Sequence, residues 1–132
     1  MAIGMNNASL ETNEISRIVI DAGMSVHTVL GLGLLESIYE TCLCYELNKR
    51  GLKVLKQVDL PVQYDNLELD SGFRLDLLIE DDVIVELKSV EALLPIHHAQ
   101  LLTYLKLSNK HVGLLINFNT VHLKDGIKRM VY

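Results

Sequence analysis

Several features that would place a chain in a specialised class are missing from this sequence. No apolar run approaches the ~18 residues that a membrane-spanning helix requires, and there is no internal repeat, low-complexity tract or linker. Hydrophobic residues make up 49% of the 132 residues and charged residues 22%, a balance that excludes a disordered chain. We therefore expect one soluble domain without a membrane partner, burying roughly two thirds of its unfolded surface around a single core.

Secretion features and paired cysteines are missing as well. Residues 1–10 lack the basic residues and the apolar core of a secretory signal. We expect them to form a flexible polar tail before a single domain at residues 11–132, in a cytoplasmic protein. Only two cysteines occur, and because Cys42 and Cys44 lie two apart in a helical pattern, their side chains diverge and cannot form a disulfide. We interpret both as buried small hydrophobic residues.

Basic residues are outnumbered by acidic ones, and the formal net charge is −5. This argues against a protein that coats nucleic acid by bulk electrostatics. The acids concentrate between Asp59 and Glu91. The bases gather on either side, at Lys49, Arg50, Lys53 and Lys56 and at Lys106, Lys110, Lys124, Lys128 and Arg129. Two basic rims around an acidic centre would suit a phosphodiester substrate, and solvated lysines on a helix end and a terminal strand would explain the same spacing.

Hydrophobic periodicity predicts an α/β domain with the element order α-α-β-β-β-α-β-β. Such an order implies a mixed β-sheet flanked by helices. A glycine bend at Gly31 and Gly33 separates the first two helices. The predicted helices are 12–31, 34–50 and 96–107, and the predicted strands are 54–64 with a hairpin after it, 74–79, 83–88, 111–118 and one or two edge strands at 121–123 and 127–131.

Two of these strands, 74–79 and 83–88, carry charged residues on one face and aliphatic residues on the other. If Ile79 pairs with Val83 across a three-residue loop, Asp76 lies opposite Glu86 on the same side of the sheet. A two-residue loop would instead place Asp76 opposite Val85. The longer loop therefore predicts two carboxylates side by side.

Asp76 and Glu86 are hard oxygen donors, and the carbonyl of Leu87 would lie beside them. This set suits Mg²⁺ or Mn²⁺ and is poor for zinc. Lys88 follows on the same face, within reach of a water that the metal activates for attack on a phosphate. The pattern favours phosphodiester hydrolysis. The structural alternative is a salt-bridge ladder with Arg74, worth tenths of a kcal/mol per pair if exposed.

Polar residues on two helices are further candidates. Gln100 and Tyr104 lie at i and i+4 on one face of the predicted helix 96–107, together with His97. An amide and a phenol there could hold a phosphate oxygen or a water, or could form a solvated face. His97 could also contact the phosphate, or act as a surface or capping residue. Glu36 lies near a helix start, where capping is its simplest role.

The motif Gly33-Leu-Leu-Glu36-Ser-Ile-Tyr39 resembles the one that names the GxxExxY protein family. The rest of the chain is similar to that family nearly end to end, and the family is placed in the PD-(D/E)xK nuclease superfamily. The resemblance implies a restriction-endonuclease-like fold. The proline of the superfamily's name is absent before Asp76, where Leu75 stands.

The resemblance also implies roles for the candidate residues. It implies that Glu36 joins Asp76 and Glu86 around a Mg²⁺ or Mn²⁺ ion, with Lys88 as the catalytic lysine. It further implies that Gln100 and Tyr104 match the Gln-xxx-Tyr helix motif of the superfamily's exonuclease-like branch.

The resulting hypothesis is a metal-dependent nuclease. We expect Glu36, Asp76, Glu86 and the Leu87 carbonyl to hold the metal. The expected partner is nucleic acid, DNA rather than RNA, and the small size of the domain suggests a homodimer through the first helix. The alternative is a catalytically silent nuclease-fold module that binds nucleic acid or a protein partner.

Overall fold

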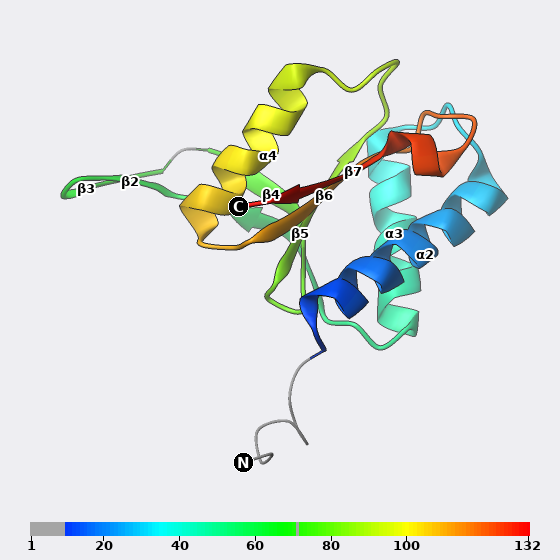
Figure 1. Ribbon diagram of the computed structural model, residues 1–132, viewed down its shortest axis with the longest axis horizontal. Helices are drawn as coiled ribbons and strands as arrows, with labels where there is room; N and C mark the ends of the chain where they lie inside the picture. Colours follow the sequence, from blue (N-terminus) through cyan, green and yellow to red (C-terminus); the bar gives the residue numbers. More distant parts are fainter. Residues whose placement is uncertain (1–9, 71) are drawn as a thin grey trace, which may run out of the picture.

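The computed structural model describes residues 10–70 and 72–132 (Figure 1). The predicted tail therefore lies outside the described residues, apart from Leu10. The described elements are α2 (Thr12–Leu30), α3 (Glu36–Lys49), β1 (Val54–Asp59), β2 (Val62–Tyr64), β3 (Leu67–Leu69), β4 (Arg74–Ile79), β5 (Val83–Lys88), α4 (Pro95–Ser108), β6 (Val112–Asn117), the 3₁₀ helix η1 (Leu123–Gly126) and β7 (Ile127–Val131). None of the described helices is long and apolar enough to cross a membrane.

Five strands form one mixed sheet in the order β1-β4-β5-β6-β7. Neighbouring strands are antiparallel except β5 and β6, which run parallel because α4 carries the chain back across the sheet between them. Helices α2 and α3 cover one face and α4 covers the other (Figure 1). The predicted α/β fold with a mixed, helix-flanked sheet is confirmed.

The three helices begin and end at residues whose local chemistry explains the boundaries. Gly31 and Gly51 follow α2 and α3 closely and have positive φ of 70° and 86°, which favours glycine at the point where each helix ends. Pro95 opens α4, where the missing N–H costs no intrahelical hydrogen bond. Asn109 ends the same helix with φ of 58°.

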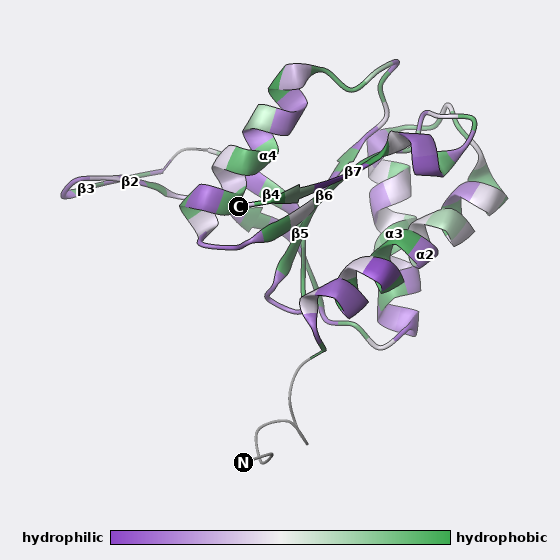
Figure 2. Cartoon of the chain, viewed as in Figure 1, coloured by the Kyte–Doolittle hydropathy of each residue, from purple (hydrophilic) through white to green (hydrophobic). Residues whose placement is uncertain are grey.

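The core has two parts, one on each side of the sheet. Alternate residues of β4 and β5, such as Leu77 and Val85, pack against α2 and α3, whereas Leu78 and Ile84 pack against α4. Figure 2 shows the central strands in hydrophobic green and more polar residues on the outer sides of the helices. β5 is therefore buried on both faces along almost its whole length.

Two predicted strands differ from the observed ones. The strand expected at 54–64 is divided at Leu60 and Pro61, since proline cannot donate to a ladder. Its second half, β2, pairs only with β3 in a hairpin that projects from the domain (Figure 1). Of the one or two edge strands expected at 121–123 and 127–131, the second forms as β7, whereas the chain turns into η1 at Leu123, whose side chain is buried in the core beside α2.

Both cysteines are free, as predicted. Cys44 is buried and Cys42 is half-buried in the layer formed by α2 and α3.

Gly126 provides a test of how the end of β6 is packed. A methyl group at this position would lie 2.3 Å from the backbone oxygen of Asn117, which cannot move without disturbing β6. Gly126→Ala should lower the free energy of unfolding by about 1–3 kcal/mol, measured by urea denaturation. Asp125→Ala, an exposed change in the same turn, should stay within about 0.5 kcal/mol of wild type. Equal stabilities of the two variants would contradict this packing.

Candidate metal and catalytic site

The β4–β5 hairpin has the register predicted for a three-residue loop. Ile79 pairs with Val83 and Leu77 with Val85, across a loop in which Glu80 and Asp81 take left-handed φ values of 53° and 54°. This register brings Asp76 and Glu86 together, as expected from the alternation of the two strands.

Beyond the Leu77–Val85 pair, the carboxylates of Asp76 and Glu86 replace backbone carbonyls as hydrogen-bond acceptors between the two strands. The N–H of Asp76 donates to Glu86 Oε2 at 2.8 Å, and the N–H of Leu87 donates to Asp76 Oδ2 at 2.8 Å. Each strand's acid thus binds the backbone of the other strand. The sheet opens at this point, and the opening is lined with carboxylate oxygens.

The salt-bridge ladder considered from the sequence does not form. Arg74 pairs with Asp59 of β1 at 3.2 Å, and both side chains are exposed. Among residues 10–70 and 72–132, no ion pair within 4.0 Å joins Lys88 to Asp76 or Glu86. The two acids are therefore held by backbone N–H groups and not by cations.

Burial makes the charge on this pair costly. Glu86 is only 6% exposed, and burial, reinforced by the charge of Asp76, raises its pKa to about 8. Burial also raises the pKa of the half-buried Asp76, while the N–H of Leu87 and the charge of Lys88 oppose that rise. A nearby cation would stabilise both groups in their ionised form.

Lys88 lies close enough to act on three acids at once. Its charge lowers the pKa of Glu36, of Asp76 and of Glu86, although burial has the larger, opposite effect on each. Lys88 is half-buried at the end of β5. One ammonium group therefore favours the ionised form of all three carboxylates.

Glu36 reaches this region from the other side of the domain. It is the first residue of α3, and Leu35, which precedes the helix, makes no side-chain cap. Although the residue as a whole is exposed, partial burial of the carboxylate raises its pKa, and the charge of Asp76 adds to that rise. The backbone N–H of Ser89, just after β5, lies near the same carboxylate and opposes the rise in its pKa.

The bend before α3 is held by Tyr39, which gives the spacing of the Gly-x-x-Glu-x-x-Tyr motif a physical cause. The Tyr39 hydroxyl donates to the carbonyl of Gly31 at 2.7 Å and accepts from the N–H of Leu34 at 3.2 Å. Its ring is buried and stacks on Phe118 with 4.5 Å between centroids. Tyr39 thereby fixes the loop that presents Glu36 to the sheet.

The polar residues predicted on α4 have different surroundings. Tyr104 is 6% exposed, and the charges of Glu86 and Asp76 add to burial in raising its pKa, so its hydroxyl lies near the acids. Gln100, one turn earlier, is half-buried. His97 Nδ1 accepts from the N–H of Leu94 at 3.0 Å, a helix-capping contact that leaves Nε2 as the ring nitrogen for any other partner.

Two further polar residues complete this region. Gln57 of β1 donates through Nε2 to Glu40 Oε2 at 2.9 Å. Both line a hollow of about 630 Å³ together with Leu35, Glu36, Ser37 and Asp76. The sequence places Glu40 beside the site, since its i, i+4 spacing puts it on one helix face with Glu36. Gln57 was not predicted, because a glutamine on a strand offers no comparable pattern.

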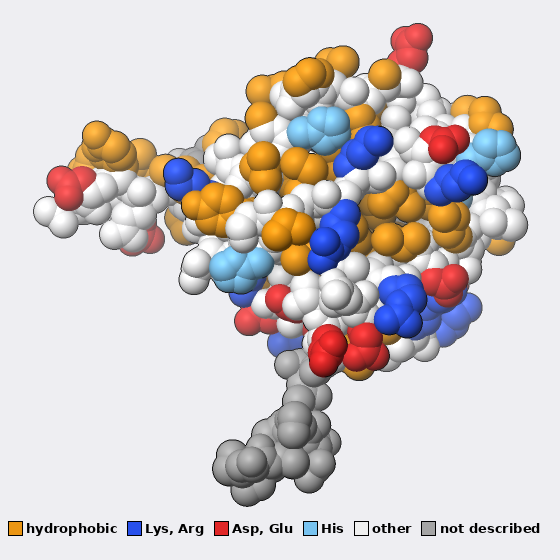
Figure 3. Space-filling model, in the orientation of Figure 1, with side chains coloured by type: hydrophobic (Ala, Val, Ile, Leu, Met, Phe, Trp, Pro, Cys, Tyr) orange, Lys and Arg blue, Asp and Glu red, His pale blue; other side chains and the backbone are white. Residues whose placement is uncertain are grey.

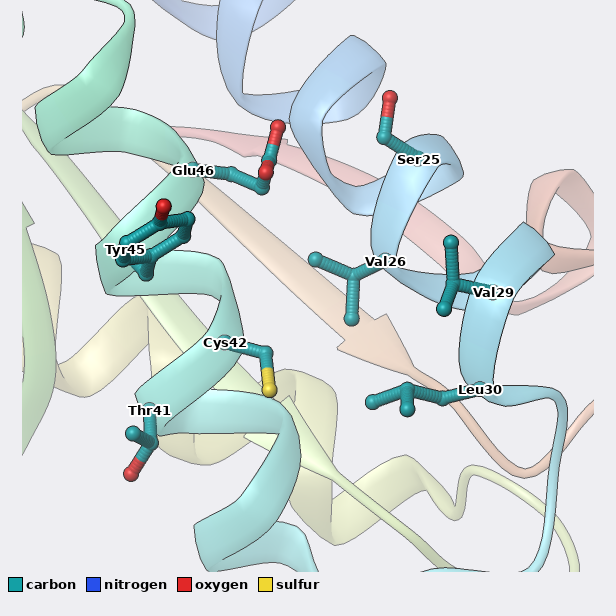
Figure 4. A pocket seen from close by; sticks show the side chains of 8 residues that line it. All are labelled: Ser25, Val26, Val29, Leu30, Thr41, Cys42, Tyr45 and Glu46. Carbon is teal, nitrogen blue, oxygen red and sulfur yellow. The ribbon is translucent and has the colours of Figure 1, made fainter.

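The largely apolar groove between α2 and α3 is separate from these acids (Figure 4). It measures about 370 Å³ and is lined by Ser25, Val26, Val29, Leu30, Thr41, Cys42, Tyr45 and Glu46. Its one acid, Glu46, already pairs with Lys49 and Arg50. The groove therefore offers apolar contact and not the chemistry of the Asp76–Glu86 pair.

The donor atoms in the opening fit a hard divalent cation better than a soft one. Asp76, Glu86 and Glu36 contribute carboxylate oxygens, the ligand type that Mg²⁺ and Mn²⁺ prefer. Within the part of the chain that the structure describes, no three His, Cys, Asp or Glu side chains are already arranged as a metal site. A cation would therefore have to draw the acids closer together.

The fold and these acids define a class: a mixed-sheet α/β domain with an acidic pair and a lysine on its central hairpin. A model of the family described as the PD-(D/E)XK nuclease superfamily matches residues 13–130. The chain belongs to this superfamily, whose members are usually nucleases that use divalent metals. No curated protein and no solved structure matches it.

The raised pKa of Glu86 predicts a pH dependence of stability in metal-free protein. A carboxyl whose pKa rises from 4.5 to about 8 on folding binds its proton more tightly in the native state. Its contribution to stability is therefore complete below pH 4.5 and is lost as the pH rises to 8, by up to about 1.4 kcal/mol per pH unit.

Glu86→Gln removes this titration, and its amide oxygen can still accept from the N–H of Asp76. Between pH 5 and pH 8, the free energy of unfolding of the variant should therefore increase relative to that of wild type. Urea denaturation with a chelator at both pH values measures the difference. A constant difference would contradict the assigned burial of the charge.

Proposed function

We propose that this protein is a metal-dependent nuclease that hydrolyses phosphodiester bonds in nucleic acid. The observation that supports this most strongly is the buried Asp76–Glu86 pair at the opening of the β4–β5 ladder, with Lys88 beside it. A buried acid pair of this kind is costly in a structural strand and useful around a cation. DNA rather than RNA as substrate, and a cytoplasmic location, belong to the same proposal.

Asp76, Glu86, Glu36 and the carbonyl of Leu87 would hold Mg²⁺ or Mn²⁺. When bound, such an ion supplies Lewis acidity and offsets negative charge on the phosphate. The ammonium of Lys88 orients the attacking water or stabilises charge that develops in the transition state.

The polar face of α4, which lies near the acids at Tyr104, would contribute groups that bind the phosphate. Tyr104 can donate its hydroxyl to a phosphate oxygen, and its burial holds the ring in one orientation. Gln100 and the Nε2 of His97 would contact the phosphate or the attacking water. As part of this proposal, the protein is a member of the GxxExxY family. The match of residues 33–39 to the GxxExxY motif and of Gln100 and Tyr104 to a Gln-xxx-Tyr pair supports this.

A catalytically silent binding module is the second candidate. Two observations favour it: the acids are not yet arranged as a metal site among the described residues, and the net charge is −5. On the face that carries α4 and β7, the Lys and Arg side chains are scattered among hydrophobic ones (Figure 3). Such a module would bind nucleic acid or a protein without cleaving anything.

Cleavage assays separate the two candidates. With Mg²⁺ or Mn²⁺ and a panel of single- and double-stranded DNA and RNA, wild type should cleave, and Asp76→Ala and Lys88→Ala should each reduce the rate by on the order of 100-fold or more. Arg17→Ala is the matched control, because Arg17 is an exposed residue of α2 that belongs to neither basic rim and lines no part of the acidic site. It should retain wild-type activity.

Either of two results would contradict the nuclease. The first is full activity in Asp76→Ala, which would remove the metal assignment. The second is stoichiometric capture of a nucleic acid that is never cleaved in the presence of either metal, which would favour the silent module.

We also propose a homodimer that buries the outer surface of α2. Val29 of this helix is 82% exposed and Tyr45 of α3 is 65% exposed, both beside the apolar groove. Light scattering at micromolar concentration should give twice the chain mass of 14.8 kDa, and Val29→Asp should restore the monomer. A monomeric wild type would remove the dimer from the proposal.

A further inference from the structure

Gln57 has an unusual backbone conformation for its place in the fold. It lies in the middle of β1 with φ of 52°, in the left-handed region that residues other than glycine rarely adopt. Its neighbours Lys56 and Val58 pair normally with Leu77 and Leu75 of β4. The distortion is therefore confined to the one position that faces Asp76 across the ladder.

The side chain of Gln57 connects two acids that belong to different elements. Its amide nitrogen donates to Glu40 Oε2 on α3 at 2.9 Å, and the same side chain lines one hollow with Asp76 of β4, close enough to lower the pKa of that carboxyl. An amide nitrogen carries two N–H groups, so one Gln can bridge two carboxylates. The bridge lies at the hollow shared by α3, β1 and β4.

Glu40 is held from a second direction as well. Lys56 Nζ lies 4.0 Å from Glu40 Oε1, whereas Gln57 contacts the other carboxylate oxygen, Oε2. Glu40 therefore anchors the Gln57 amide beside Asp76.

We propose that Gln57 is a positioning residue that holds the Asp76 carboxylate in the orientation required to bind the divalent cation. This inference rests on the proposed metal-dependent function and adds a residue to it. Packing does not account for the strain, because Gln57 is exposed and outside both core clusters. Strained backbone of this kind persists where the surroundings impose it and is concentrated at functional sites.

The test uses two variants that keep the backbone and lose the bridge. Gln57→Gly removes the amide and adopts the left-handed φ without strain. Gln57→Asn tolerates the same φ and keeps the amide, but its side chain is one methylene too short to reach both acids. Gln63→Ala, at an exposed glutamine of the projecting β2–β3 hairpin, is the control.

Two quantities are measured on each protein without substrate. These are the dissociation constant of Mn²⁺ by calorimetry and the melting temperature of the metal-free form. Partners that orient a metal ligand typically contribute 10- to 100-fold in affinity, so we expect both Gln57 variants to bind Mn²⁺ at least about 10-fold more weakly. Because Gly relieves the strain, the melting temperature of Gln57→Gly should equal or exceed that of wild type.

A Gln57→Gly variant that binds Mn²⁺ more weakly but melts no lower than wild type supports a positioning role. If Gln57 were purely structural, its replacement would lower both the Mn²⁺ affinity and the melting temperature. The inference alone is overturned if wild type binds Mn²⁺ and both Gln57 variants bind it within twofold of wild type. If wild type binds no Mn²⁺, the proposed function fails, and this inference fails with it.

Discussion

Two backbone N–H groups at the end of the β4–β5 ladder determine the character of this domain. Buried N–H groups require acceptors, and at the end of the β4–β5 ladder Asp76 and Leu87 find theirs in carboxylates instead of carbonyls. This substitution keeps two acids inside the protein, because moving either one away would leave a donor unpaired. Lys88 and Tyr104 then complete an environment in which negative charge is concentrated and water is partly excluded.

The acid from α3 depends on a different kind of constraint, one of loop geometry. The Tyr39 hydroxyl hydrogen-bonds to backbone groups on both sides of the glycine bend, and its ring stacks on Phe118, just after β6. These contacts fix the start of α3 relative to the sheet. Ser89 adds a second tie, donating its hydroxyl to the carbonyl of Leu34 at 2.6 Å. Glu36 is thus positioned by residues that need not take part in any reaction.

What could be predicted from the sequence was what depends on periodicity and loop length. The three helices followed from the helical period of their apolar residues. The hairpin register followed from strand alternation, because a one-residue slip would have turned the acids of β4 to the opposite face. The turn at Leu123 did not follow, since tertiary packing against α2 decides it. Gln57 was not predicted for a related reason. No sequence pattern indicates that a glutamine adopts positive φ, and its role depends on Glu40 and Asp76, which are brought close to it only by the fold.

The loop between β4 and β5 carries none of the candidate residues, yet its length constrains them. If the turn keeps its three-residue geometry, an insertion of one residue there shifts the pairing by one and places Asp76 opposite Val85, whereas substitutions at Glu80 or Asp81 leave the register intact. The β2–β3 hairpin has no such restriction, because it pairs only with itself. Over evolutionary time, length variation should therefore accumulate at residues 65–66 and be excluded at residues 80–82, even though both turns lie at the surface.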